Sequence, residues 1–262
     1  ETSGFKADAG KVLLLPDGAG GLSGVLLGIG DGSDPFITGA LASALPVRSY
    51  RFAGNLGATA DNAVLGFAFG TYQFTLYTGR VREHPRLILP EGVDGEELSR
   101  IAAAIFLVRD LINTPANDMS PADLADAALA VARTHGAKAS VIVGDDLLHQ
   151  NYPMVHAVGR AAEVAPRLID FTWGRADAPK VTLVGKGVCF DTGGLDLKPS
   201  SAMLLMKKDM GGAANVLALA DLLMGAKLDI RLRVLIPAVE NNVAGNAFRP
   251  GDVLKSRRGF SV

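Results

Sequence analysis

Short apolar runs alternate along this chain with longer stretches in which apolar residues recur at helical spacing. This alternation continues from end to end and is typical of a β-sheet that is covered by helices. We therefore predict the α/β fold class. We expect strands at residues 11–16, 25–30, 86–90, 139–144, 154–158, 166–173, 180–185 and 229–237, and helices at 61–78, 96–111, 122–135 and 209–223.

The predicted helix at 96–111 separates two regions of different character. Glycine-rich sequence precedes it, and a more regular alternation of strands and helices follows it. The helix begins with acidic residues, which suit the helix dipole, and it ends before the turn-forming stretch NTPANDMSP. We predict a small N-terminal α/β domain at 1–95, a linking helix at 96–112 and a second domain at 113–262.

The composition of the chain excludes several classes of protein. Hydrophobic residues make up 48% and charged residues 20% of its 262 positions, which supports a buried core and argues against disorder. The net charge of −1 argues against a nucleic-acid partner. No uninterrupted apolar run of about 18 residues offers a membrane span. The single cysteine, Cys189, excludes a disulfide framework and a thiolate zinc cluster. Because the polar start does not resemble a signal peptide, we expect a soluble cytoplasmic protein.

Polar residues of the kind that carry chemistry gather at 181–214. A predicted strand runs there into a glycine-rich loop and then into a helix. Lys186 follows the apolar strand, Asp191 precedes Thr-Gly-Gly, Lys198 precedes a proline, and Asp209 stands at the helix start. Ligand sites of open α/β sheets lie at such carboxyl ends of strands.

Two interpretations of this cluster stay open on the residue types alone. The carboxylates and lysines either form ion pairs around a loop, or they build a site for a hard metal ion, since Asp oxygens suit Zn, Mn or Mg. A lysine binds a metal only as the neutral amine, and both burial and a nearby dication lower its pKa. A second, protonated lysine would polarise a carbonyl group.

Other catalytic motifs are missing or weak. The chain has no P-loop, no GxSxG and no HExxH, and Phe190 takes the place of the third glycine in a dinucleotide fingerprint. We interpret the four histidines as surface or helix-end residues and Cys189 as a buried small hydrophobe. Both a nucleotide-binding enzyme and a serine hydrolase are therefore disfavoured.

Residues in the last part of the cluster have two interpretations each. Met203 and Met206 line a pocket or pack beneath the loop, whereas Met210 is expected in the core. Asp209 is either a helix N-cap or a ligand. The glycines at 211 and 212 favour the ligand, because they permit close backbone approach.

The cluster resembles the leucyl aminopeptidase family, the cytosolic dinuclear-metal aminopeptidases. The resemblance extends from about residue 109 to the end of the chain. Its motifs are NTPANDMSP (113–121), VGKGVCFDTGG (184–194), LDLKP (195–199), LMKKDMGGAANVL (205–217) and IPAVEN…RPGDVL (236–254). The resemblance implies a mixed-sheet α/β/α catalytic domain after the N-terminal domain.

The resemblance also implies a role for five residues. Lys186 would be the neutral lysine ligand of one metal, Asp191 would bind or bridge both metals, and Asp209 would complete the lysine-side site. Lys198 would polarise the scissile carbonyl, and Met206 would line the pocket for the N-terminal side chain. The implied cofactors are two divalent cations, Mn or Zn. The implied activity is removal of N-terminal, preferentially apolar, residues from peptides by a two-metal activated water, in a cytoplasmic homo-hexamer.

One family motif is missing from the sequence. The family continues to an Asn-Thr-Asp-Ala-Glu-Gly-Arg segment with further carboxylate ligands, whereas this sequence ends RRGFSV. We therefore expect an incomplete catalytic domain and little or no peptidase activity of the 262-residue chain alone. The alternative is a non-catalytic binding or regulatory fragment, or a decayed relative on the same scaffold. Asp229 and Glu240 do not replace the missing carboxylates.

Overall fold

The computed structural model describes residues 4–245, 249–254, 256 and 258–262. The chain divides into two compact units, Glu1–Phe106 and Leu107–Val262. The division falls inside helix α3 (Gly95–Asn113). Among the described residues, no helix combines the length and the apolar character that a membrane crossing requires.

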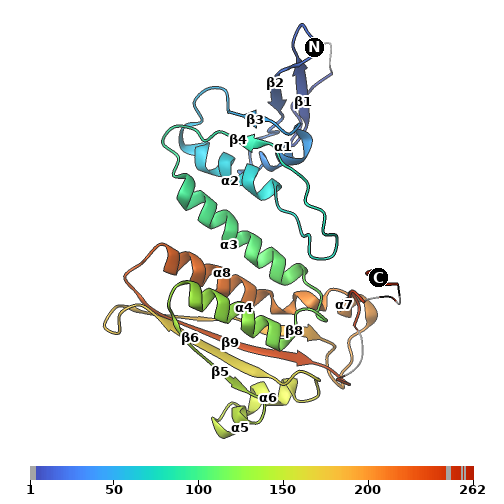
Figure 1. Cartoon of the computed structure of the whole chain (residues 1–262), viewed down its shortest axis with the longest axis vertical. Coiled ribbons are helices and arrows are strands. Elements are labelled where there is room, and N and C mark those ends of the chain that lie inside the picture. Colours follow the sequence, from blue (N-terminus) through green and yellow to red (C-terminus); the bar gives the residue numbers. More distant parts are fainter. Residues whose placement is uncertain (1–3, 246–248, 255, 257) are drawn as a thin grey trace. The chain divides into compact units, whose positions relative to one another are not determined.

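The first unit is small and mixed (Figure 1). Strands β1 (Val12–Pro16) and β2 (Leu22–Leu27) pair antiparallel, and the short strands β3 (Ser49–Tyr50) and β4 (Arg86–Leu87) pair parallel. The helical elements of this unit are α1 (Gly39–Ala44), the 3₁₀ helix η1 (Gly57–Thr59), α2 (Ala60–Gly70) and the start of α3. Their apolar faces build the core around Leu41, Leu45, Phe67, Val64, Leu65 and Leu98.

The predicted helix at 61–78 is too long. Helix α2 ends at Gly70, and the following segment is a loop in which the side chain of Gln73 replaces a helical hydrogen-bond ladder. The Gln73 amide accepts from Arg82 N at 2.8 Å and donates to Arg82 O at 2.7 Å. This long-range pairing outweighs the helical spacing of the apolar residues.

The second unit is built on a mixed sheet, as predicted. Strand β6 (Arg167–Trp173) lies between β5 (Lys138–Val143) and β9 (Arg231–Asn241) and pairs antiparallel with both. Strands β7 (Lys180–Val184) and β8 (Gly187–Asp191) both pair parallel with β9 and follow one another along it. Helices α4 (Pro121–Thr134) and α8 (Gly211–Gly225) cover one face, and the short helices α5 (Asp146–His149) and α6 (Pro153–Gly159) lie on the other (Figure 1).

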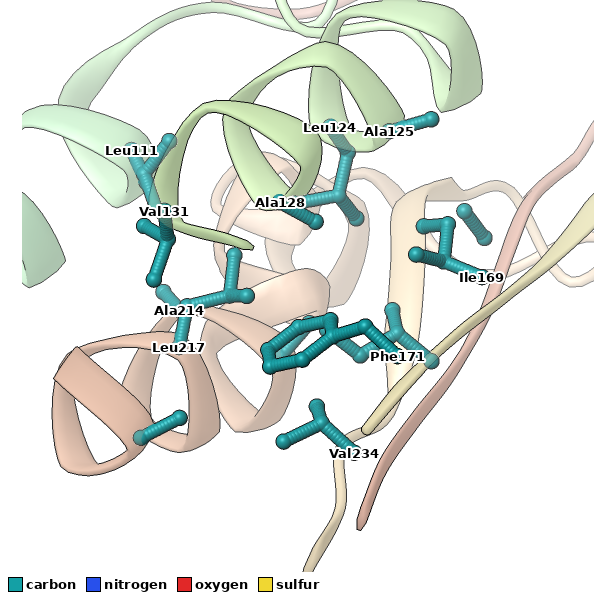
Figure 2. Close-up of a cluster of buried hydrophobic side chains, with 14 of the residues drawn as sticks. Leu111, Leu124, Ala125, Ala128, Val131, Ile169, Phe171, Ala214, Leu217 and Val234 are labelled. Carbon is teal, nitrogen blue, oxygen red and sulfur yellow. The ribbon is translucent and has the colours of Figure 1, made fainter. Parts of the chain in front are cut away.

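The core of the second unit lies between the sheet and helices α4 and α8. In Figure 2, Phe171 points from β6 towards these helices, with Leu124, Leu217 and Val234 around it. Alternate residues of β9 are fully buried: Leu232, Val234, Ile236 and Ala238. This period-2 pattern is the one that a strand with a packed face requires. Met210 also lies in this core, as predicted.

Helix α4 begins as its sequence predicts. Ser120 and Asp123 form a reciprocal capping box, and Pro121 occupies the first helical turn, where its missing N–H costs nothing. The predicted strand at 154–158 is wrong, because these residues belong to α6. Pro153 opens that helix, and an apolar run this short does not distinguish a strand from a helix by periodicity.

Two further predictions are corrected near the predicted site. The helix predicted at 209–223 begins only at Gly211, after the short helix α7 (Ser200–Met203) and the 3₁₀ helix η2 (Met206–Met210). Strand β8 was not predicted, because its short apolar run follows a glycine and resembles a loop. It forms because β9 offers unpaired backbone groups alongside it.

Candidate metal and catalytic site

Lys186 stands at the junction of β7 and β8, where the first turn of α8 comes very close. Ala213 N donates to Lys186 O at 2.9 Å. A Cβ atom at Gly185 would lie 2.7 Å from the Ala213 Cα, and one at Gly212 would lie 3.1 Å from Lys186 N. The small residues on both sides therefore bring the sheet edge and the helix start together, and they place Lys186 next to η2.

Substituting Gly212 by alanine is expected to destabilise this junction by about 1–3 kcal/mol, because overpacking forces the backbone apart. The matched control is Gly211→Ala. An added Cβ at Gly211 meets only the end of the Ile112 side chain at 3.4 Å, and its φ of −59° is already helical. Urea unfolding of both variants measures the difference. Equal stability of the two variants would contradict the close-approach argument.

Asp209 pairs with Lys186. The Lys186 Nζ lies 2.8 Å from Oδ1 and 2.7 Å from Oδ2 of Asp209. Only the contact with Oδ1 has hydrogen-bond geometry, so Oδ2 is buried without a hydrogen bond among the described residues. Asp209 does not cap α8, whose N-cap is Met210. The interpretation of Asp209 as an N-cap is therefore wrong, and its carboxylate faces the lysine instead.

Helix η2, which carries Asp209, is anchored at both of its ends. Met210 is fully buried in the core. Lys207 donates from Nζ to Asn113 O at the end of α3, at 2.6 Å, and its burial lowers the pKa of this lysine. These contacts hold the Asp209 carboxylate against the end of the sheet.

Asp191 and Lys198 form a second pair around the Gly-Gly turn. The Lys198 Nζ lies 2.5 Å from Asp191 Oδ2. The other oxygen, Oδ1, accepts from Gly193 N at 2.9 Å and from Asn241 Nδ2 at 2.8 Å. The turn needs glycine, since Gly193 has a φ of +91° and a Cβ there would lie 2.2 Å from Asp196 O.

The Asp191 carboxylate is held in its ionised form. Burial by itself opposes ionisation, but the hydrogen bonds from Lys198, Gly193 and Asn241 outweigh it. Together with the charge of Lys198, they keep the pKa of Asp191 below the ordinary carboxyl value. The Asp191 side chain is therefore an anion at neutral pH.

The structure brings four of the five predicted site residues together as two Asp–Lys pairs, and β8 packs directly against η2. Both interpretations of the sequence keep support, because the pairs are ion pairs and because Oδ2 of Asp209 is buried without a hydrogen bond among the described residues. Two carboxylates and an amine fit a divalent cation. Among the described residues, no group of three or more His, Cys, Asp or Glu side chains is placed to hold a metal ion.

The remaining candidates lie as follows. Met203 and Met206 are half-buried, Met206 at the start of η2. Cys189 is buried, as predicted, and desolvation raises the pKa of its thiol. The histidines are helix-end or loop residues that pair with neighbouring side chains. His135, which follows α4, lies 2.7 Å from Asp221 of α8.

Asp229 and Glu240 are both engaged away from the two pairs. Asp229 pairs with the exposed Arg175, and the buried Glu240 pairs with Arg249. Sequence reasoning assigned no role to Asn241, although it lies in the quoted IPAVEN motif and contacts Asp191 directly. The sequence signal that could have indicated a role for Asn241 is its position, as a polar residue, at the end of a buried strand.

Comparison with known proteins decides the family. The model of the "Cytosol aminopeptidase family, catalytic domain" (M17) matches residues 106–262, and that of the "M17 aminopeptidase, N-terminal domain" matches residues 1–90. This chain belongs to the M17 cytosol aminopeptidase family. The resemblance seen in the sequence motifs is thereby confirmed.

Among M17 proteins, a probable cytosol aminopeptidase of Hydrogenovibrio crunogenus is 41% identical over 62% of this chain and 33% of its own length. One of Xanthomonas axonopodis pv. citri is 33% identical over 97% of this chain and 54% of its own length. This chain therefore spans about half the length, or less, of these curated relatives.

Solved structures show the same fold. The cytosol aminopeptidase of Coxiella burnetii is 44% identical and superposes with a TM-score of 0.87, over 100% of this chain and 57% of its own. The bottromycin maturation enzyme BotP, solved in complex with Mn, is 33% identical with a TM-score of 0.81, over 99% of this chain and 60% of its own.

Proposed function

We propose that this chain is part of a metal-dependent aminopeptidase that removes N-terminal, preferentially apolar, residues from peptides. The observation that carries the proposal is the pairing of Lys186 with Asp209 and of Lys198 with Asp191 at the end of β8. Family membership supports the reaction class. We further propose that the complete protein acts in the cytoplasm as a homo-hexamer.

Lys186, Asp191 and Asp209 would hold the divalent cations, Mn or Zn. The Mn complex of BotP supports this choice of metal. When bound, such cations would supply Lewis acidity and would lower the pKa of a water molecule. Lys186 would hold a cation as the neutral amine, together with the Asp209 carboxylate that it contacts here.

Lys198 has a different role in this proposal. Its ammonium group would leave its contact with Asp191 Oδ2 and donate to the oxygen of the scissile carbonyl, where negative charge develops. Met206 would line the pocket for the first side chain of the peptide. Both residues lie on short segments next to the paired carboxylates.

A direct test is Mn²⁺ titration of the 262-residue chain by calorimetry. The chain is expected to bind Mn²⁺, and Asp209→Asn is expected to abolish that binding, because it removes a carboxylate charge already desolvated by burial. Asp229→Asn, at an exposed carboxylate, is the control. An Asp209→Asn variant with unchanged Mn²⁺ affinity would contradict the assignment. Peptide hydrolysis by this chain alone is expected to be little or none.

One observation favours the alternative, a non-catalytic binding role on the same scaffold. In the part of the chain that the structure describes, acidic side chains do not gather in threes around the paired lysines. A wild-type chain that binds peptides but no Mn²⁺ would support this alternative over the peptidase.

A further inference from the structure

Asn241, the last residue of β9, is the main connection between the sheet and the Asp191 turn. Its carbonyl oxygen accepts from Thr192 N at 2.9 Å and from Thr192 Oγ1 at 2.8 Å. Its side-chain Nδ2 donates to Asp191 Oδ1 at 2.8 Å. Asn241 accepts two of these hydrogen bonds and donates the third. Together they fix the backbone after Asp191 and one oxygen of its carboxylate.

The strand register creates this contact. Strands β8 and β9 pair in parallel from Gly187, but the register shifts between Val188 and Asp191, and Asp191 then stands opposite Asn241. Such irregularities re-aim side chains at the ends of strands. Without the shift, the two side chains would not share this end of the sheet in the same way.

The neighbouring residue on β9 anchors the strand from its other side. Glu240 is buried and pairs with Arg249 through both carboxylate oxygens, at 2.5 and 2.8 Å. Asn242 Nδ2 donates to the same carboxylate at 3.0 Å. Alternation along a strand sends Glu240 and Asn241 to opposite faces. The position of Asn241 is therefore set by a network that does not include Asp191.

The turn also leaves Asn241 little freedom. A Cβ atom at Gly194 would lie 2.9 Å from Asn241 Oδ1, and Gly194 has a φ of +66°. Gly194 N in turn donates to Thr192 Oγ1 at 3.1 Å. The amide of Asn241 is thus packed against the turn with its donor directed at Asp191.

The two oxygens of the Asp191 carboxylate therefore have different partners. Oδ1 is occupied by Asn241 and Gly193, and Oδ2 faces Lys198. We propose that Asn241 is a positioning residue that fixes the rotation of the Asp191 carboxylate so that Oδ2 points to the cation and substrate side. The effect of Asn241 on cation binding rests on the proposed function. The fixed orientation of the Asp191 carboxylate can be tested without a cation.

The test is Asn241→Leu in the 262-residue chain, which keeps the number and branching of the side-chain heavy atoms and removes the donor. Asn242→Leu is the matched control, since it makes the same change one residue along, against Glu240. Crystal structures of both variants without metal are compared, and Mn²⁺ affinity is measured by titration. We expect Asp191 to rotate only in Asn241→Leu, with Mn²⁺ affinity 10–100-fold weaker (about the effect of losing an outer-shell partner).

The control variant is expected to unfold at a lower urea concentration with wild-type Mn²⁺ affinity. An unchanged Asp191 orientation in Asn241→Leu would overturn the inference, as would equal loss of affinity in both variants. If Asn241→Leu does not fold, Asn241→Ala is used in its place. A wild-type chain that binds no Mn²⁺ would refute the proposed cation site, and the Asp191 orientation in the variant would still decide the role of Asn241.

Discussion

Replacing Arg249 by methionine is expected to lower the free energy of unfolding by about 3–5 kcal/mol, because it leaves a buried carboxylate without its counter-ion. The side chain of Glu240 is only 2% exposed and that of Arg249 14%. The Arg249 side chain donates twice to Glu240 and once, at 3.1 Å, to the equally buried Asp252. These bonds raise the pKa of Arg249 further above its ordinary value.

The network reaches further than one pair. Asp252 Oδ1 accepts from Asn117 N at 3.2 Å, and the side chain of Asn117 exchanges hydrogen bonds with Val253 N and O. The loss of Arg249 therefore loosens the loop before α4 as well as the end of β9. Urea unfolding followed by circular dichroism measures the change.

Two control variants separate buried from exposed charge. Arg233→Met breaks the ion pair between Arg233 and Asp170, whose side chains are 46% and 24% exposed respectively. This variant is expected to lose less than about 1 kcal/mol of unfolding free energy. The double variant Glu240→Leu/Arg249→Met removes both buried charges and is expected to recover much of the loss. A loss of less than about 1 kcal/mol in Arg249→Met would show that Glu240 finds another partner.

The second large effect concerns Lys198. In the complete enzyme that we propose, Lys198→Ala is expected to lower kcat about 10²–10³-fold, because it removes a donor aimed at developing negative charge. Its Nζ contacts Asp191 Oδ2 and is partly exposed, so substrate can reach it. Steady-state hydrolysis of a leucyl peptide, with metal content measured on the same samples, tests this expectation.

Lys180→Ala is the matched control, since Lys180 is an exposed lysine at the start of β7. It is expected to keep the wild-type kcat. Bound metal is expected to change little in Lys198→Ala. Unchanged turnover in Lys198→Ala would remove Lys198 from the mechanism, and loss of metal in parallel with activity would make it a structural partner of Asp191 instead.

Local patterns predicted much of the second unit. Apolar runs indicated β6 and the main part of β9, and a helix predicted at 122–135 corresponds to α4. These predictions succeed because they depend on neighbours in the sequence. The strand predicted at 154–158 failed because its apolar run is too short for its period to be measured.

The candidate site was predicted as a set of residues but not as an arrangement. Lys186, Asp191, Lys198 and Asp209 stand out in the sequence because polar residues interrupt glycine-rich and apolar surroundings. Which carboxylate meets which lysine depends on how β8 meets η2, and these segments are separated in the sequence by the glycine turn and the short helix α7. Sequence spacing alone left the cap and ligand interpretations of Asp209 open.

The sequence by itself determined the fold class and the types of side chain available for chemistry, since both follow from local pattern and composition. Its motifs also carried the resemblance to the family. Only the tertiary structure decided the pairings, the buried Glu240–Arg249 anchor and the contact between Asn241 and Asp191. The physical reason is that these contacts join residues on different segments of the chain, between 7 and 50 positions apart in the sequence. Their energies depend on burial and on strand register, which form only when the whole sheet has assembled.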